Sequence, residues 1–534
     1  MKQKGQLYSG GGIVTMDPAR SHAEALAVRA GTIVAVGTVE ECRSALGSDY
    51  ECIDLSGGAL LPGFIDTHLH PTVMVFYEMN ADLGVIGSME ELRTVLHAAS
   101  LKGSPESWLV GLNFDEQKLT PPSLPSRHDL DVACSTRPLI ILRHDAHLII
   151  ANTRAIEAMG ITAATPDPPA GVIDREENGY PTGVFREIMV QQVLSAMPMP
   201  DMDIYEKSGR DTFTKLAACG ITSAGIVLQT GAEGPAGSAG TYDVLAMQLL
   251  LPNVPVNLYG LMITDDPAQV EAARQTGLHK TGLGGNRIGG VKFYSDGAFG
   301  SCTAFMQEPY SDHPETRGLL MHSPDELYRR MLAAHLSGLQ ICVHAIGDEA
   351  NRLCAELFSR LLTEHPLPSH RHRIEHASIL DEETIARIAR LGLVVSTQPL
   401  FIHSEKHWLH KRLGPERAKR TYPFRAMLDA GIHLAGASDA PIESTDVLHA
   451  IHCCITREGF EPQQGITVME ALRMFTIDAA YAQFEESVKG SLTPGKRADM
   501  VVLSSNPLTT PTNEIRSIRV ENTIVGGVTI YTRT

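Results

Sequence analysis

The sequence has little that would mark a disulfide-linked, membrane-spanning or nucleic-acid-binding protein. Its nine cysteines are an odd number and none forms a Cys-x-x-Cys pair, which excludes a zinc ribbon and favours reduced thiols in a cytoplasmic protein. No stretch of about 18 residues is free of charges and helix breakers, so no membrane span is predicted. The polar, glycine-rich start carries no apolar signal core. Basic residues are outnumbered, 45 against 62, and the formal net charge of −17 argues against nucleic acid or anionic membrane as the main partner.

Short apolar runs alternate with helix-length segments through the middle of this 534-residue chain. Helices are predicted at 324–336, 348–364, 381–391 and 468–480 from their caps and apolar spacing. Buried strands that alternate with helices form a parallel sheet, and eight such units favour closure into a (β/α)8 TIM-like barrel of the α/β class. The predicted strands lie at 63–67, 222–227, 256–263, 288–294, 340–343, 373–375, 393–396 and 433–436.

Both ends of the chain are predicted to form strands and hairpins without intervening helices. Apolar runs at 13–16, 25–28 and 33–37 stand near the start, and others at 499–503 and 523–531 stand near the end. Each end is too small to close a core by itself. We therefore expect 1–60 and 485–534 to form one composite β-sandwich, and 61–484 to form the barrel.

The segment between Pro71 and about Met202 is too long for a single crossover helix and contains several prolines. We interpret it as a subdomain inserted after the first barrel strand, at about 72–202. An insert at this place either shapes the substrate pocket or serves as a simple structural cap.

The strongest local signal is the pair His68 and His70 at the end of the first predicted barrel strand. Alternate residues on a strand point the same way, so both imidazoles can reach one metal ion. Neutral imidazole suits zinc and related divalent ions. Such a pair alone is more often a surface or packing feature, but here it closes a buried strand directly before Pro71.

Other side chains of metal-ligand type also stand at predicted strand ends. Lys292 lies in the fourth run, His344 and His376 end the fifth and sixth, and Asp439 follows the eighth. Barrel enzymes place their catalytic groups at the carboxyl ends of the strands. Two structural alternatives stay open, namely that Lys292 is a buried lysine paired with Asp296 and that Asp439 is a helix N-cap.

At these residues the sequence resembles the amidohydrolase superfamily, in the amidohydrolase 3 or YtcJ-like branch that contains N-substituted formamide deformylases. The resemblance covers essentially the whole chain. The matching strings are Pro-Gly-Phe-Ile-Asp-Thr-His-Leu-His at 62–70, Gly-Leu-Asn-Phe-Asp at 111–115, Val-Lys-Phe-Tyr-Ser-Asp-Gly at 291–297, His-Ala-Ile-Gly-Asp at 344–348, Gly-Ala-Ser-Asp-Ala-Pro at 436–441 and Gly-Lys-Arg-Ala-Asp at 495–499.

The resemblance implies one or two divalent metal ions, with zinc as the expected ion. His68 and His70 would hold the more buried ion, and His344 and His376 the more exposed one. Lys292 would bridge the two as a carbamate, or carboxylysine. An ammonium group cannot bind a cation, whereas a carbamate is an anion with two oxygens. A one-metal site without the carbamate would act by a related route.

Asp439 is implied to be both a metal ligand and the catalytic general base. A metal ion lowers the pKa of its water from about 15.7 to near 7, which makes hydroxide available at neutral pH. Asp439 would take the proton of that water and pass it to the leaving nitrogen.

Asp115, His147, Asp296 and Gln398 are weaker candidates for substrate binding, and a structural role is favoured over substrate binding for each. Glu375, beside His376, is expected to pack or to form a hydrogen bond behind a metal ligand.

The sequence thus predicts a metal-dependent hydrolase of a carbon–nitrogen bond other than a peptide bond, in a small N-substituted amide or formamide. A cyclic-amide hydrolase or a deaminase of the same superfamily is the alternative. A regulatory barrel without activity is disfavoured, because a degraded site would be expected to lack at least one of the six residues. The expected partner is a small-molecule substrate, with neither nucleic acid nor membrane, and the resemblance is consistent with a homodimer.

Overall fold

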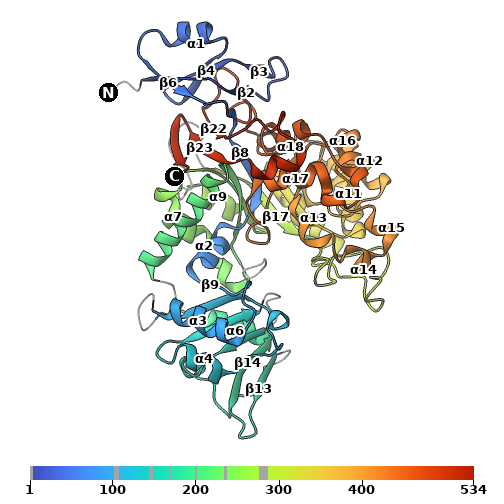
Figure 1. Cartoon of the computed structure of the whole chain (residues 1–534). Helices are drawn as coiled ribbons and strands as arrows, with labels where there is room; N and C mark the ends of the chain where they lie inside the picture. Colours follow the sequence, from blue (N-terminus) through green and yellow to red (C-terminus); the bar gives the residue numbers. More distant parts are fainter. Residues whose placement is uncertain are drawn as a thin grey trace. The chain divides into compact units, whose positions relative to one another are not determined.

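The structure, a computed structural model, describes residues 4–101, 107–143, 148–168, 171–198, 201–231, 233, 237–275 and 287–534 (Figure 1). The chain forms two compact units. The first comprises Met1–Pro71, Phe213–Leu228 and Val254–Thr534, and the second comprises Thr72–Thr212 and Gln229–Asn253.

The first unit contains a sheet of eight parallel strands whose spatial order follows the chain, which is the arrangement of a (β/α)8 barrel. Each strand coincides with one of the eight predicted runs, so the predicted fold class is confirmed. Nearly every residue of these strands is buried, as expected for a parallel sheet covered on both faces. The strands are β8 (Phe64–Leu69), β15 (Ile221–Gln229), β16 (Asn257–Ile263), β17 (Arg287–Tyr294), β18 (Gln340–Ala345), β19 (Arg373–His376), β20 (Val394–Thr397) and β21 (Leu434–Gly436).

The first and last strands of this sheet meet at their carboxyl ends. The Thr67 hydroxyl donates a hydrogen bond to the Gly436 carbonyl at 3.0 Å. Beyond the strands, the Asp439 N–H bonds the His68 carbonyl and the His70 N–H bonds the Ala440 carbonyl, both at 2.8 Å. These contacts place the loop after β21 directly beside the end of β8.

Helices follow the barrel strands. Those at the predicted positions are α10 (Pro324–Leu336), α11 (Asp348–Glu364) and α12 (Glu382–Leu391), with Ser323 and Asp381 as N-caps. The others are α7 (Met202–Ala218), α9 (Pro267–Gln275), α13 (Leu400–Glu405), α14 (Leu409–Leu413), α15 (Pro415–Ala418), α16 (Phe424–Asp429), α17 (Val447–Thr456), α18 (Val468–Met474) and α19 (Ile477–Ala482).

The prediction of a single helix at 468–480 was wrong, because this segment forms two helices, α18 and α19. Thr476 lies between them with φ −134° and ψ −99°, outside the helical region. The preceding carbonyl, of Phe475, accepts the N–H of Ile65 in β8 at 2.8 Å. The helix is thus interrupted at the point where its backbone carbonyl accepts a hydrogen bond from barrel strand β8.

Strands from both ends of the chain share one six-stranded sheet, in which blue and red segments lie together, and a four-stranded sheet of amino-terminal strands packs with it (Figure 1). One core joins them, containing Tyr8 and Ile33 from the start and Met500 and Ile524 from the end. This confirms the predicted sandwich of both termini. The sheets are β5-β4-β1-β6 and β24-β23-β22-β7-β2-β3. Their strands are β1 (Gly5–Ser9), β2 (Gly12–Val14), β3 (His22–Ala23), β4 (Ala25–Arg29), β5 (Thr32–Gly37), β6 (Tyr50–Asp54), β7 (Ala59–Pro62), β22 (Met500–Leu503), β23 (Val520–Val525) and β24 (Val528–Thr532), with α1 (Val39–Leu46) beside the first sheet.

A buried polar network joins the sandwich to the amino-terminal end of the barrel. The carboxylate of Asp499 accepts hydrogen bonds from Arg497 and Asn257, each at 3.2 Å, and from the Gly526 N–H at 2.8 Å. Asn257, the first residue of β16, also donates to the Thr222 carbonyl at 3.0 Å. The matching string at 495–499 therefore anchors the end of the chain under the barrel.

The second unit is built on a six-stranded mixed sheet with helices on both faces. In β11 the side chains alternate, so that Leu139 packs in one core with α3 and α4, whereas Ile140 packs in another with α5 and α6. The sheet order is β13-β14-β12-β11-β10-β9. Its elements are α2 (Pro71–Met79), β9 (Ala81–Asp82), α3 (Met89–Ser100), β10 (Leu109–Phe114), α4 (Arg127–Ala133), β11 (Leu139–Arg143), β12 (Leu148–Ala151), α5 (Thr153–Ala158), β13 (Gly171–Arg175), β14 (Pro181–Glu187), α6 (Ile188–Ser195) and α8 (Asp243–Leu250).

All nine cysteines are free, including the adjacent and buried Cys453 and Cys454. None of the helices in the described parts of the chain is long and apolar enough to cross a membrane.

We predict that Asp499→Ala lowers the free energy of unfolding by about 3–5 kcal/mol, because it breaks a buried ion pair and leaves buried donors without their acceptor. Urea denaturation followed by circular dichroism measures the change. Glu521→Gln is the matched control, since its ion pair with Arg519 is exposed, with 56% and 34% of the two side chains accessible. That control should change stability by less than about 0.5 kcal/mol. Equal stability of the two variants would contradict the anchoring role.

Candidate metal centre

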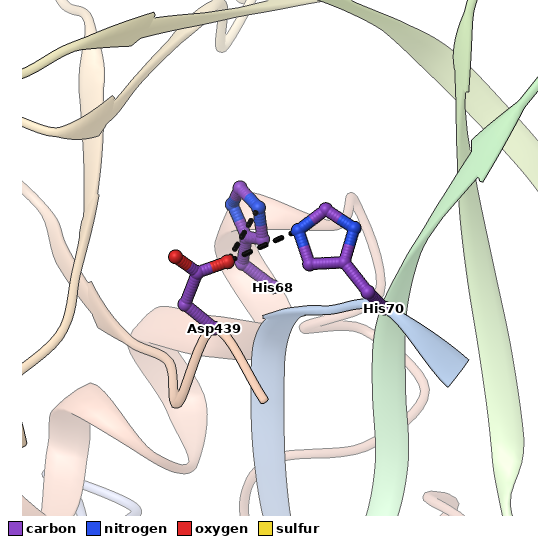
Figure 2. A group of neighbouring side chains, drawn as sticks. All are labelled: His68, His70 and Asp439. Atoms are coloured by element: carbon purple, nitrogen blue, oxygen red, sulfur yellow. Dashed lines mark hydrogen bonds and ion pairs between the residues drawn. The ribbon is translucent and has the colours of Figure 1, made fainter. Parts of the chain in front are cut away.

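His68, His70 and Asp439 meet at the carboxyl end of the barrel (Figure 2). Asp439 Oδ1 lies 3.4 Å from His68 Nε2 and 3.1 Å from His70 Nε2. The three ligand atoms all lie within 4.8 Å of one another, and the three residues are buried. Three donor atoms therefore meet in one small volume. They come from His68 in β8, His70 just after β8, and Asp439 after β21.

The backbone that carries these side chains is held by Asp66. One oxygen of its buried carboxylate accepts the N–H groups of His68 and Ser438, both at 3.1 Å. Asp439 itself has φ +58°, a left-handed conformation that is uncommon outside glycine. The next helix, α17, begins eight residues later with Asp446 as its N-cap, so the alternative that Asp439 caps a helix was wrong.

The structure brings Lys292, His344 and His376 to the same place. Lys292 is fully buried in β17, with Nζ 3.5 Å from His68 Nε2. The His376 ring centroid is 5.3 Å from that of His68 and 4.4 Å from that of His344. All six side chains predicted at strand ends thus form one connected cluster.

Three of the imidazoles have one ring nitrogen fixed by an acceptor. His68 Nδ1 donates to Glu375 Oε2 at 2.6 Å, and His376 Nδ1 donates to Gln398 Oε1 at 2.9 Å. His344 Nε2 donates to the Gly297 carbonyl at 3.0 Å. Because a neutral imidazole carries one proton, the opposite nitrogen of each ring keeps its lone pair for another ligand.

Burial sets the charges in the cluster. It lowers the pKa of His68 to about 3 and that of His376 to about 4, and it lowers the pKa of His344 well below its usual value. Burial alone would raise the pKa of Asp439, but its interactions with His68 and His70 hold that pKa below its usual range. At neutral pH these three imidazoles are therefore neutral and the Asp439 carboxylate is ionised.

Lys292 is fully buried, and among the described residues no carboxylate forms an ion pair with it. In the described part of the chain it forms no ion pair with Asp296, so that alternative was wrong. Asp296 instead accepts the N–H groups of Ile346, Gly347 and Phe305 at 2.8–3.1 Å. Burial lowers the pKa of Lys292, which favours its neutral amine.

These donors fit a divalent cation. Lone pairs on imidazole nitrogens and a carboxylate oxygen are the ligand set that zinc and similar ions take. The neutral form of Lys292 is also the form that reacts with CO2. Without a cation, the Asp439 carboxylate and the imidazole lone pairs, all of them electron-rich, face one another. A bound cation would accept these lone pairs and remove their mutual repulsion.

The weaker candidates lie in different places. Gln398 is buried behind His376, and Asp296 lies 3.5 Å from His344 Nε2, so both contact the cluster from behind. Asp115, in the second unit, caps a short 3-10 helix by accepting the Gln117 N–H. His147 lies outside the described residues. Substrate binding by these residues stays a prediction.

Sequence reasoning missed one member of the site, Arg373. Its guanidinium forms an ion pair with Glu375, with Nε 2.7 Å from Oε1, and its Nη2 donates hydrogen bonds to Glu375 Oε2 and to the Thr67 carbonyl, both at 3.0 Å. Both side chains of this ion pair are fully buried. The signal was available, since Arg373 and Glu375 alternate on β19 and therefore share a face. The hydrogen bond from His68 confirms the expectation for Glu375.

The model of the Amidohydrolase family (Amidohydro_3) matches residues 51–531. YtcJ of Bacillus subtilis, a protein that carries the name amidohydrolase, is 29% identical over 98% of this chain and 99% of its own length. The N-substituted formamide deformylase of Arthrobacter pascens is 28% identical over 97% of both chains. The crystal structure of an uncharacterised metal-dependent hydrolase from Pyrococcus furiosus has a TM-score of 0.77 at 26% identity, and the match covers 95% of this chain and all of that one.

We predict that Gln398→Met weakens zinc affinity about 10- to 100-fold, because His376 loses the acceptor that orients its ring. Competition with a chromophoric chelator measures the affinity. Gln483→Met is the matched control, since Gln483 is equally buried and its side-chain atoms have no hydrogen-bond partner among the described residues. An affinity in Gln398→Met equal to that of the control would show that the contact orients nothing.

Proposed function

The chain belongs to the amidohydrolase family, and on this basis we propose that it is a metal-dependent hydrolase of a carbon–nitrogen bond other than a peptide bond. The observation that carries the proposal is the convergence of His68, His70 and Asp439 on one buried point at the carboxyl end of the barrel. The proposed substrates are small N-substituted amides or formamides, supported by the full-length similarity to N-substituted formamide deformylase.

The proposed ligand set divides between two ions. His68 and His70 would hold one, His344 and His376 would hold the other, and Lys292 would serve both as a carbamate. When bound, divalent ions such as zinc lower the pKa of water and polarise the substrate carbonyl. Glu375, Gln398 and the Gly297 carbonyl keep three of the rings in the tautomer that this binding requires.

Asp439 moves the proton in the proposed reaction. As a water oxygen bonds to the carbonyl carbon, Asp439 accepts the proton that this water releases. When the carbon–nitrogen bond then breaks, the same proton passes from Asp439 to the leaving nitrogen, so the reaction yields a carboxylic acid and an amine. An ionised carboxylate is needed at the start, and the depressed pKa of Asp439 provides it.

Lys292 forms the carbamate by reaction of its neutral amine with CO2. The new N–C bond displaces one proton to solvent and leaves an anion with two oxygens. The change converts a buried neutral amine into an anion, which would lie between the two proposed ions. Full burial of Lys292 and its lowered pKa both favour the amine that reacts.

The intact cluster argues against a regulatory protein that has lost catalysis. A site no longer under selection would not be expected to keep the six ligand candidates and also the buried partners that fix three of them. The choice between linear amides and the cyclic amides or amino-heterocycles of the alternative depends on which substrates the protein turns over.

We expect purified protein with zinc restored to hydrolyse N-formyl and N-acyl amines, measured by the amine released. Asp439→Asn should lower kcat about 10²- to 10⁴-fold, because the proton acceptor is lost. Asp429→Asn, at a surface carboxylate that is 65% exposed, is the control and should leave kcat unchanged. Turnover of cyclic amides or amino-heterocycles alone would transfer the assignment to the alternative. No turnover of any of these compounds would overturn it.

We expect Lys292→Ala to lose activity and to recover part of it when formate or acetate is added, because a small carboxylate can enter the space left by the side chain. Lys292→Met is the matched control, since its thioether fills that space and should prevent recovery. In wild-type protein, 13C-labelled CO2 should give one carbamate resonance. Full activity of Lys292→Met would show that the carbamate is not needed.

A further inference from the structure

A second group of metal-ligand side chains lies on α17 and its neighbours and shares no residue with the barrel cluster. His449, His452 and Cys453 are spaced three and four residues apart on α17, so they lie on one face of the helix. Glu458 follows in the 3-10 helix η4 (Arg457–Gly459), and His403 comes from α13.

The distances in this group are those of a compact site. His403 Nδ1 lies 2.8 Å from Glu458 Oε2, and His449 Nε2 lies 3.1 Å from Glu458 Oε1. The two imidazole centroids are 4.8 Å apart. Ligand atoms of these three residues all lie within 4.8 Å of one another, and the same holds for His452, Cys453 and Glu458. One carboxylate is therefore shared by two overlapping groups of donors.

The side chains of the group differ in their exposure to solvent. The side chains of His449 and Glu458 are each 10% exposed, whereas that of His403 is 46% exposed. The Nδ1 atom of His452 is buried and has no hydrogen-bond partner in the described part of the chain. A buried ring nitrogen without a partner is costly unless a ligand satisfies it.

We propose that His403, His449 and Glu458 bind a divalent ion of the zinc class, separate from the barrel ions, with the overlapping group of His452 and Cys453 beside it. Two or three imidazoles with one carboxylate form a typical zinc ligand set. Because its ligands come from α13, α17 and η4, the ion would tie together segments that follow the last two barrel strands. The proposal does not depend on the proposed catalytic function.

Two cations compete for the same carboxylate. Lys406 Nζ contacts Glu458 Oε2, and Arg516 lies 3.9 Å from Oε1. Without a metal ion, Glu458 is the centre of an ion-pair network. A bound ion must displace the ammonium of Lys406 and is repelled by it, so removing this charge should strengthen metal binding if the site is real. If Glu458 only organises ion pairs, removing Lys406 cannot create affinity for zinc.

The experiment is a zinc titration of the full chain in a His68→Asn/His70→Asn/His376→Asn background, which disables the barrel centre. One equivalent of zinc should still bind. His449→Asn in that background should remove it, and Lys406→Met should tighten its binding about tenfold or more. His407→Asn, at an exposed histidine of the same segment, is the matched control and should change neither the amount of zinc bound nor its affinity.

The outcomes separate this site from the catalytic proposal. Retention of the equivalent in His449→Asn, no equivalent in the background chain, or unchanged affinity in Lys406→Met would each overturn the second site. None of them bears on the barrel centre, which is tested by turnover in the otherwise unchanged chain. Circular dichroism of each variant confirms that it is folded before its zinc is counted.

Discussion

The barrel cluster depends on the meeting of the first and last strands of one sheet. His68 and Asp439 are 371 residues apart in sequence but face each other because the loop after β21 bonds the end of β8. Asp66 accepts N–H groups from both sides of this junction with a single oxygen. Closure at this point thus creates the site, and a barrel open between these strands would hold two histidines without their carboxylate.

Behind the cluster, a buried charge pair sets the orientation of His68. Arg373 and Glu375 form an ion pair in which both side chains are fully buried, so both charges lose their hydration. Here the second oxygen of Glu375 receives His68 Nδ1–H, and Arg373 also holds the Thr67 carbonyl at the end of β8. The pair therefore links β19 to the strand that carries the histidines, and it fixes the tautomer of His68.

The regular parts of this molecule were predictable from its sequence because each depends on local pattern. Eight apolar runs gave eight strands, and polar residues at their ends gave the six members of the cluster. The predictions that were wrong concerned residues whose partners lie far away in the sequence. The Phe475 carbonyl is used by β8, Asp296 is used by backbone N–H groups, and Asp439 is held beside His68 rather than at a helix start. No local pattern encodes such partners. The only sequence evidence for Gln398 was its position directly after a predicted strand. That position could not show whether its side chain contacts a substrate or the imidazole of His376.

The two carboxylates that face imidazoles differ in their other neighbours, and this difference orders their expected affinity for cations. In the described part of the chain, the ion-pair partners of Asp439 are His68 and His70, both of them imidazoles that are neutral ligands when deprotonated. Glu458 also forms ion pairs with Lys406 and Arg516, which are basic side chains. A cation that enters the barrel cluster meets a carboxylate that is not paired with a lysine or an arginine. A cation that approaches Glu458 must first break the ion pair between Glu458 and Lys406. The barrel centre should therefore fill first as metal is supplied. Because Coulomb repulsion at these distances is strong in a partly buried site, the charge of Lys406 alone can decide whether the second group binds metal at cellular concentrations.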